Sequence, residues 1–498
     1  MTTEAASTRN VLDRLDQNVP TRFYWSLTLL ATLGGFLFGY DTSNIGAALD
    51  FLPYKMGDFA TGYLVAGASL GAAAGALLAG PLTDRFGRRA LLIVDALIYA
   101  VGALLAAFTP NVGVLLFART LIGLAIGADS AIATAYIAEY APRKRRGALV
   151  MLQQWMITVG ILVSYLVALV ILKLLPGSAT TLDWRLFFGL GAVPALIGLV
   201  LRFEMPESPR WLMRQHRYDD TRKAFGKLGI DASTEDIEYT AQQVERADRA
   251  QQRQRRRGWT PGVRRALLIV CGFFMFQQIT GINVPLYYGP QLLGQYFQSG
   301  GGQVSVTTAG IEVTAIMTAV NVAATYLAFR YIDRIGRRKL ALGGFAGMAV
   351  AALIAAIGIG LMTATPQLVV AMIGLDGFIA SFAIGVGGTG WLIQGETFPT
   401  AVRGQAAAIA ATVDWLANYA IIEAFPAWHR AIGVGWVLVC FAALCLLAVG
   451  FVGRYLPETK GLSVEQVTYL YEEQAAGVDG RSGPVKKRSS GHRVALGH

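Results

Sequence analysis

The chain has 498 residues, of which 54% are hydrophobic and 15% are charged, and its mean hydropathy is +0.47. This composition is too apolar for a soluble enzyme of that size, so we expect the chain to lie in a membrane. The net charge of +11 does not indicate a nucleic-acid-binding protein, because the basic residues fall in short clusters between apolar runs.

The first 22 residues are polar and contain no short apolar run with a cleavage site, so we expect a cytoplasmic segment and no removable signal peptide. Stretches of about 20 apolar residues, the length that crosses a bilayer as a helix, follow roughly twelve times. Their approximate bounds are 23–48, 60–80, 90–109, 112–140, 148–173, 185–204, 265–297, 307–330, 339–362, 367–395, 402–425 and 431–453.

Basic residues concentrate in the connections that follow every second span. Cytoplasmic loops of membrane proteins are enriched in Lys and Arg, so both termini are predicted to be cytoplasmic, in a multi-pass protein of the cell (inner) membrane. The opposite connections are almost free of basic residues, with Lys55, Lys173, Arg185 and Arg430 as the main exceptions. The basic connections carry Arg85, Arg88 and Arg89; Arg143 to Arg146; Arg253 to Arg257; Arg334, Arg337, Arg338 and Lys339; and Arg403.

Three ordered motifs recur at a spacing of about 250 residues, which indicates two homologous six-helix halves. We expect the halves at 23–204 and 263–454, a cytoplasmic helical linker at 205–262 and a cytoplasmic tail at 455–498. Two such halves form a ligand pathway between them and alternate access by rocking. The repeated motifs are Asp84 to Arg89 with Asp333 to Arg338, Glu139 and Arg146 with Glu396 and Arg403, and Pro206-Glu207-Ser208 with Pro457-Glu458-Thr459.

Asp41 lies within the first predicted span, where an ionised carboxylate is costly unless it has a function or a buried partner. Arg119, in the fourth span, is the candidate partner. The pair is either sensitive to protons or a permanent salt bridge that holds the N-terminal half together.

Gln277, Gln278 and Asn283 lie inside an apolar run long enough to cross a bilayer. Amides in hydrocarbon cost free energy unless they are hydrogen-bonded, and three amides facing one place suit a neutral, hydroxyl-rich ligand. On a straight helix Asn283 would point away from Gln277. Gly281 and Pro285 weaken the helix there, so we expect the backbone to turn Asn283 toward the same site.

Taken in order, these motifs resemble the sugar porter branch of the major facilitator superfamily, which includes facilitative glucose transporters and bacterial proton-coupled sugar symporters. The resemblance covers nearly the whole chain, and the double glutamine identifies the branch because organic ion transporters share the Pro-Glu-Ser-Pro-Arg motif. It implies an all-α membrane fold of twelve transmembrane helices in two pseudo-symmetric halves. The matching stretches are Gly39 to Asp41, the Asp84 and Asp333 loops, Arg119, Glu139 to Gly147, Pro206 to Leu212, Gln277 to Asn283, Glu396 to Gly404 and Pro457 to Gly461.

The resemblance also implies roles for individual residues. Asp41 with Arg119 is the proton-coupling pair, which favours symport because uniporters often carry a neutral residue where Asp41 stands. The cytoplasmic gate is a latch of ion pairs that changes rates more than substrate choice. Its members are Asp84, Arg88, Arg89, Glu139, Arg146, Asp333, Arg337, Arg338, Glu396 and Arg403. The expected substrate-binding residues are Gln154, Gln277, Gln278, Asn283, Asn321, Trp391 and Asp414, with Phe38 and Tyr288 as weaker aromatic candidates that ordinary packing explains equally well.

Two aspartates depart from the family pattern. Asp414 stands where well-known members present a neutral amide, and a carboxylate there could accept two hydroxyl groups, hold a second proton or pair with a cationic ligand such as an amino sugar. Asp129 falls about 80° from Arg119 around its helix, so it need not share the Asp41 site, and a structural bond to a neighbouring helix explains it as well.

The sequence therefore predicts a monomeric proton-coupled importer of a neutral sugar or polyol, surrounded by membrane lipid and without nucleic acid. The alternatives are a facilitative uniporter, an organic-cation or drug transporter, and a transporter-like nutrient sensor acting through its tail. We do not expect an enzyme, a cofactor or a metal, because the chain lacks a nucleophile with its base, a metal-ligand cluster and a phosphate-binding loop.

Overall fold

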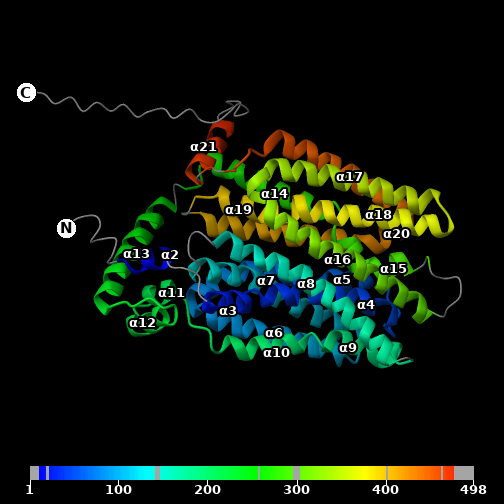
Figure 1. Ribbon diagram of the computed structural model, residues 1–498, viewed down its shortest axis with the longest axis horizontal. Helices are drawn as coiled ribbons and strands as arrows, with labels where there is room; N and C mark the ends of the chain where they lie inside the picture. The colour runs from blue at the N-terminus through cyan, green and yellow to red at the C-terminus, as the bar shows by residue number, and fades with distance from the viewer. Residues whose placement is uncertain are drawn as a thin grey trace, which may run out of the picture.

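The computed structural model describes residues 10–17, 22–140, 146–175, 177–255, 258–294, 296, 303–399, 402–460, 462 and 464–475. These residues form helices and no strand. The long helices run side by side in two layers, one built from the first half of the chain and one from the second (Figure 1). The expectation of an all-α membrane protein built from two halves is thus confirmed.

The first layer is the N-terminal half. Its predicted first span is divided at Thr32 into two helices, and its predicted sixth span is also built from two helices. The elements are α3 (Arg22–Ala31), α4 (Leu33–Ala48), η1 (Leu49–Phe51), α5 (Asp58–Phe86), α6 (Arg88–Ala107), α7 (Val112–Tyr140), α8 (Arg146–Leu174), η2 (Ala179–Asp183), α9 (Trp184–Gly189) and α10 (Ala192–Arg202).

The second layer is the C-terminal half, in which two of the long helical segments are interrupted. One interruption lies between Ile279 and Asn283, and the other is the π-helical turn Ala383–Gly387. The elements of this half are α14 (Pro261–Ile279), α15 (Asn283–Gly294), α16 (Gln303–Ile335), α17 (Arg337–Leu361), α18 (Ala364–Phe382), the π-helical turn η4 (Ala383–Gly387), α19 (Gly388–Thr397) and α20 (Arg403–Tyr455).

Helix α20 contains two of the predicted spans. Its 53 residues include Gly433 with φ 79°, a value that breaks a helix. A straight helix of this length would measure about 80 Å, far more than the hydrocarbon thickness of about 30 Å. The break therefore divides α20 into two membrane-length segments that match the predicted spans 402–425 and 431–453.

Ten segments among the described residues are long and apolar enough to cross a membrane. The predicted first span, built from α3 and α4, is not among them, and α20 is counted once. If α20 crosses twice and α3 with α4 crosses once, these segments give twelve crossings, a total that stays a prediction.

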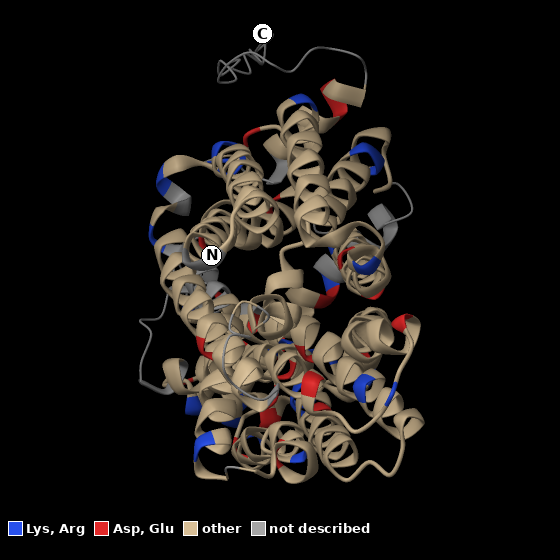
Figure 2. Ribbon diagram, turned by 90° about the vertical axis from the view of Figure 1, so that its right-hand side faces the viewer, with Lys and Arg blue, Asp and Glu red and all other residues tan. Residues whose placement is uncertain are grey.

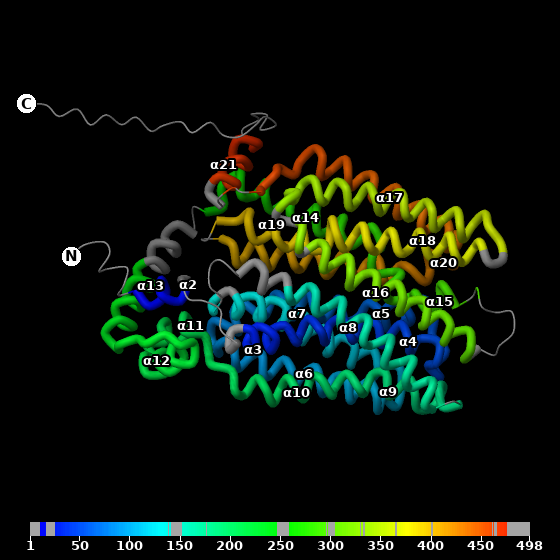
Figure 3. The backbone as a smooth tube through the Cα atoms, viewed as in Figure 1, coloured from blue at the N-terminus to red at the C-terminus, as the bar shows by residue number. Residues whose placement is uncertain are grey.

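The polar helices gather at one end of the bundle (Figures 1 and 3). There α2 lies against α13, where Thr240 Oγ1 accepts from Val11 N at 3.0 Å and Arg14 pairs with Asp236 at 2.7 Å. We call this end, which also carries the arginine-containing connections, the basic end. The polar elements are α2 (Val11–Gln17), α11 (Pro209–Arg214), α12 (Tyr218–Lys227), α13 (Thr234–Arg255) and α21 (Val464–Ala475).

The outer faces of the long helices are apolar. Viewed along the helices, the ribbon carries few charged positions (Figure 2). Large apolar side chains such as Val200 and Leu268 are 65% and 72% exposed. A face of this kind is stable against lipid and would be unstable in water.

Candidate functional site

The amide-rich stretch lies at a break in the seventh predicted span, as expected. Helix α14 ends at Ile279 and α15 begins at Asn283. Gly281 between them has φ 88°, and a Cβ added to it would lie 2.3 Å from the Phe441 ring. Only glycine fits this backbone conformation and this contact.

Gln278 is the centre of a buried hydrogen-bond network. Its Nε2 donates to Asp414 Oδ1 at 2.7 Å, and its Oε1 accepts from Asn283 Nδ2 at 2.8 Å. The same oxygen accepts from Asn418 Nδ2 at 3.1 Å. The helix break therefore turns Asn283 toward Gln278, and α20 supplies the other two polar groups.

This network crosses from one half of the molecule to the other. Asn418 Oδ1 accepts from Ser69 Oγ at 3.0 Å, and Ser69 lies on α5 of the N-terminal half. Neither residue is in the predicted site. Asn418 could have been found because it lies one turn from Asp414 on the same face, whereas a single serine in the small-residue run of α5 gives no such signal.

Gln277 lies beside the network with its side chain buried. Its Nε2 donates to the carbonyl of Gly387 at 3.0 Å, in the π-helical turn that precedes α19. Its Oε1 accepts no hydrogen bond from any described residue. Buried amide oxygens nearly always have a partner, so this atom is available to a ligand hydroxyl.

The three predicted aromatic residues each pack against another aromatic ring. The Trp391 ring lies 5.0 Å from Phe274, and the Phe38 ring lies 5.1 Å from Trp415, both edge to face. Tyr288 instead packs against Phe425 at 4.7 Å between ring centroids, with its hydroxyl donating to the Ile422 carbonyl at 3.2 Å. Those contacts are typical of ordinary packing.

The two remaining predicted ligand residues lie on helices of opposite halves. Asn321 on α16 is buried, and its Oδ1 lies 3.4 Å from Thr325 Oγ1. Gln154 on α8 is half-buried.

Asp41 and Arg119 form an ion pair inside the N-terminal half. The side chain of Arg119 is fully buried and that of Asp41 is 2% exposed. Arg119 Nε also donates to the Leu64 carbonyl at 3.0 Å. Arg119 on α7 therefore connects its own helix to α4 and α5. Of its two partners, the Asp41 carboxylate is charged and the Leu64 carbonyl is neutral.

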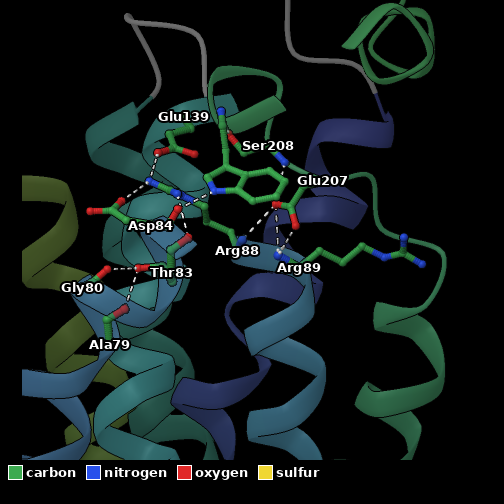
Figure 4. Close-up of polar contacts among 10 residues, drawn as sticks. Ala79, Gly80, Thr83, Asp84, Arg88, Arg89, Glu139, Glu207 and Ser208 are labelled. Atoms are coloured by element: carbon green, nitrogen blue, oxygen red, sulfur yellow. Dashed lines mark hydrogen bonds and ion pairs between the residues drawn. The ribbon is translucent and has the colours of Figure 1, made fainter. Parts of the chain in front are cut away.

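At the basic end, Arg88 connects α5 and α7 of the N-terminal half with Glu207, which follows α10 (Figure 4). Its guanidinium lies 3.0 Å from Glu139 Oε1 and 3.4 Å from Asp84 Oδ1. Its backbone N–H donates to Glu207 Oε1 at 2.9 Å, and the Arg89 N–H donates to the same carboxylate. Glu207 thus caps the N-terminus of α6, where the helix dipole favours negative charge.

The C-terminal half repeats this arrangement. Arg337 pairs with Glu396 at 2.7 Å, and Glu458 accepts from the N–H groups of Arg337 and Arg338 at 2.9 and 3.2 Å. Glu207 and Glu458 are outside the predicted gate, although the repeated Pro-Glu-Ser/Thr motif was the available signal. Arg403 Nε donates to the Phe398 carbonyl, and the side chains of Arg146 and Asp333 lie outside the described residues.

Contacts between the halves lie at the network and toward the end opposite the basic end. Gln291 Nε2 donates to the Gly46 carbonyl at 3.0 Å, Thr307 Oγ1 donates to Asp50 Oδ2 at 3.1 Å, and Arg430 pairs with Asp58. In contrast, the ion pairs Arg88–Glu139 and Arg337–Glu396 at the basic end each lie within one half.

Asp129 does not contact Arg119. Its Oδ1 pairs with Arg202 Nη2 at 2.7 Å, and both side chains are buried. The residue thus bonds to a neighbouring helix of its own half.

Comparison with known proteins gives full-length relatives. A family model described as "Sugar (and other) transporter" matches residues 27–471. The arabinose-proton symporter of Bacillus subtilis is 32% identical over 475 residues, covering 93% of this chain and 99% of the relative. The glucose transporter GlcP of Staphylococcus epidermidis is 33% identical over 452 residues, covering 90% and 97%.

Solved structures show the same fold. The xylose transporter XylE from E. coli in a partially occluded inward-open conformation aligns with TM-score 0.76 and 28% identity, over 89% of this chain and all of that one. The proton:xylose symporter XylE bound to 6-bromo-6-deoxy-D-glucose aligns with TM-score 0.73 and 29% identity, over 90% and 99%. The chain is therefore a transporter and not an enzyme, and it belongs to the sugar transporter family of the major facilitator superfamily.

Proposed function

We propose that this protein imports a neutral sugar or polyol by proton symport. The observation that carries the proposal is the buried Asp41–Arg119 ion pair in a member of the sugar transporter family. The relatives named as an arabinose-proton symporter and a proton:xylose symporter support it. A facilitative uniporter would have no need of an ionisable group at Asp41.

The substrate binds where the amide network joins the two halves. Gln278, Asn283 and Asn418 offer donors and acceptors to one another that hydroxyl groups can replace, and Gln277 Oε1 is an acceptor without a described donor. Such groups recognise polar but uncharged ligands. The proposed ligand set is Gln154, Gln277, Gln278, Asn283, Asn321, Trp391 and Asp414, with the indole of Trp391 facing the C–H side of a sugar ring.

Protonation of Asp41 is the coupling step. While Asp41 is ionised, Arg119 holds α4 against α7 and α5. A neutral Asp41 loses most of its attraction for the guanidinium, so α4 can move relative to its neighbours when the halves rock. The membrane potential can drive this step, since one charge moved through 100 mV gains about 2.3 kcal/mol.

The arrangement of contacts supports an inward-facing conformation. Arginine-rich loops face the cytoplasm in membrane proteins, so we assign the basic end, with both termini, to the cytoplasm. The halves then contact each other toward the outer side, through pairs such as Arg430 with Asp58, while the gate pairs Arg88–Glu139 and Arg337–Glu396 each lie within one half. We infer that the gate residues join the two halves in the outward-facing state, and that the protein works as a monomer.

A cationic substrate is the second candidate, because Asp414 places a carboxylate in the network. Its described partner is the neutral amide of Gln278, and it has no ion pair among the described residues. An ammonium group of an amino sugar would supply one. Asp129 no longer supports this candidate, since Arg202 already pairs with it.

The test is uptake by purified protein in proteoliposomes, with labelled hexoses, pentoses, inositol and one amino sugar, with and without an inward proton gradient. Symport of a neutral sugar predicts accumulation that a protonophore abolishes. Equilibration that ignores the gradient would mean uniport. Uptake of the amino sugar alone would replace the neutral substrate with a cationic one.

A further inference from the structure

A second group of charged side chains lies inside the N-terminal half, apart from the Asp41–Arg119 pair. Arg202, the last residue of α10, lies 2.7 Å from Asp129 Oδ1 on α7 and 3.8 Å from Asp95 Oδ2 on α6. It also donates to the Leu92 carbonyl at 2.6 Å. The exposed fractions of Asp95, Asp129 and Arg202 are 6%, 1% and 0%. We call these three residues the acid triad.

The charges of the acid triad do not balance. Two ionised carboxylates beside one guanidinium would leave one net negative charge at membrane depth, which is costly. Two of the carboxyl oxygens, Asp95 Oδ1 and Asp129 Oδ2, are buried and have no hydrogen-bond partner among the described residues. Both carboxyl groups face the same guanidinium, at 2.7 and 3.8 Å. Two carboxyl groups that share one buried cation repel each other unless one of them carries a proton.

Among the described residues Arg202 is the cation that pairs with either carboxyl group. On α4, Gly34 packs so closely that a Cβ there would lie 1.5 Å from Asp129 Oδ2. On α6, the next turn presents Tyr99, whose hydroxyl donates to the Leu37 carbonyl at 3.0 Å. The described side chains of α3, residues 25–31, are all uncharged. A proton is therefore the cation that can balance the second carboxylate.

The acid triad lies where it can exchange a proton with the basic end of the molecule. Asp95 lies two helical turns, about 10 Å, from Arg88 at the start of α6. Gly34, which contacts Asp129, lies two turns from Asp41 along α4. The acid triad thus lies between the Asp41–Arg119 pair and the basic end of the same half.

We propose that the acid triad is a second proton-binding site, in which Asp95 and Asp129 share one proton beside Arg202. This inference is independent of the identity of the transported sugar and of the role of Asp41. It assigns a function to Asp129 and Asp95 that the transport site does not require. Replacement of either aspartate by asparagine removes the need for the proton, because the remaining carboxylate then balances Arg202 alone.

The test is infrared spectroscopy of the purified full-length protein at neutral pH, in which a protonated carboxyl group gives its own C=O stretching band. Difference spectra between the wild type and Asp95→Asn, and between the wild type and Asp129→Asn, are expected to show the loss of one such band in each case. Asp220→Asn is the control, since Asp220 lies in the exposed linker helix α12 beside Arg217 and its spectrum should retain the band.

A second measurement covers the case in which one variant folds poorly. The folded wild type holds a proton that the unfolded chain releases at neutral pH, so its thermal stability should fall, relative to either asparagine variant, as the pH is raised. Parallel pH profiles for the wild type and both variants, or a carboxyl band that persists in both, would overturn the proposal.

Discussion

The carboxylate of Asp41 on α4 contacts the guanidinium of Arg119 on α7 inside one half of the molecule, and not between the halves. Under the proposed symport mechanism, protonation of Asp41 would therefore not cut a bond across the central interface. It would release α4 from α7, and α4 contacts the other half because the Gly46 carbonyl accepts from Gln291. The ion pair thus involves the helix that lies at the interface.

Asp41→Asn should abolish concentrative uptake while sugar exchange continues, because a neutral amide mimics the protonated state permanently. Uptake would then level off at equilibrium with or without a proton gradient. The measurement is accumulation and counterflow in proteoliposomes, with Asp220→Asn as the matched control on the exposed linker. Accumulation that survives in Asp41→Asn would remove this residue from the coupling mechanism.

Gln278→Ala should weaken substrate binding more than any other single change in the network. It removes the partner of Asp414, Asn283 and Asn418 together. Leaving buried polar groups unpaired costs about 1–3 kcal/mol, which corresponds to about a 5- to 150-fold rise in Kd. The measurement is substrate binding by calorimetry.

Gln367→Ala serves as the control for Gln278→Ala, since its amide bonds to the Ile359 carbonyl at the α17–α18 connection. That variant should bind substrate normally. Equal losses in the two variants would indicate a general effect on the fold and would contradict the central role of Gln278.

The sequence was sufficient to predict where the helix breaks at the candidate site, but not which polar groups meet there. Gly281 and Pro285 are local signals, so the turn of Asn283 toward Gln278 could be expected from the chain alone. The bond from Ser69 to Asn418 joins helices of different halves, and nothing in the local pattern of α5 indicates it. Pairing across an interface depends on packing geometry, which a single sequence does not contain.

At the basic end too, the sequence predicts some of the contacts and only the structure shows the others. The repeat correctly indicated that Arg88 and Glu139 have counterparts in Arg337 and Glu396, because internal symmetry is visible in the sequence. That Glu207 caps the start of α6 required the structure, since the two are more than a hundred residues apart.

Gly87→Ala should destabilise the protein. Gly87 has φ 92°, and an added Cβ would lie 2.3 Å from Glu207 Oε2, so the substitution strains the backbone and displaces the cap of α6. The expected loss is about 1–3 kcal/mol, seen as a lower unfolding temperature in detergent. Gly80→Ala, in open space within α5, should be neutral or slightly stabilising. A Gly87→Ala variant as stable as Gly80→Ala would contradict this account.

Asp414→Asn distinguishes the two substrate classes. An asparagine oxygen can still accept from Gln278 Nε2, so transport of a neutral sugar should persist with less than about a tenfold change in KM. Transport of an amino sugar should be lost, because its ammonium would have no carboxylate. The measurement is uptake of one neutral and one amino sugar by the same preparation. Loss of neutral-sugar transport alone would show that the carboxylate itself is needed to bind hydroxyl groups or a second proton.

Asp50 should make the end of the protein opposite the basic end sensitive to pH. It is half-buried in η1, where burial raises the pKa of its carboxyl while hydrogen bonds from Thr307 and Gln291 partly oppose the rise. When the halves separate at this end, water reaches Asp50 and its pKa returns toward the ordinary value of about 3.9. The closed form then binds the proton more tightly than the open form. Acid on this side should favour closure, and opening should become easier as the pH rises through the window above the ordinary value.

The measurement is the distance between spin labels on the two halves, as a function of pH. Phe59→Cys on α5 and Val304→Cys on α16 provide exposed labelling positions at this end once Cys271, Cys440 and Cys445 are replaced. The label distance should lengthen as the pH is raised. In Asp50→Asn, which keeps the side-chain shape but cannot ionise, the distance should not respond over the same pH range. A pH response that is unchanged in this variant would have to come from another group, and would refute the role of Asp50 in closing this end of the protein.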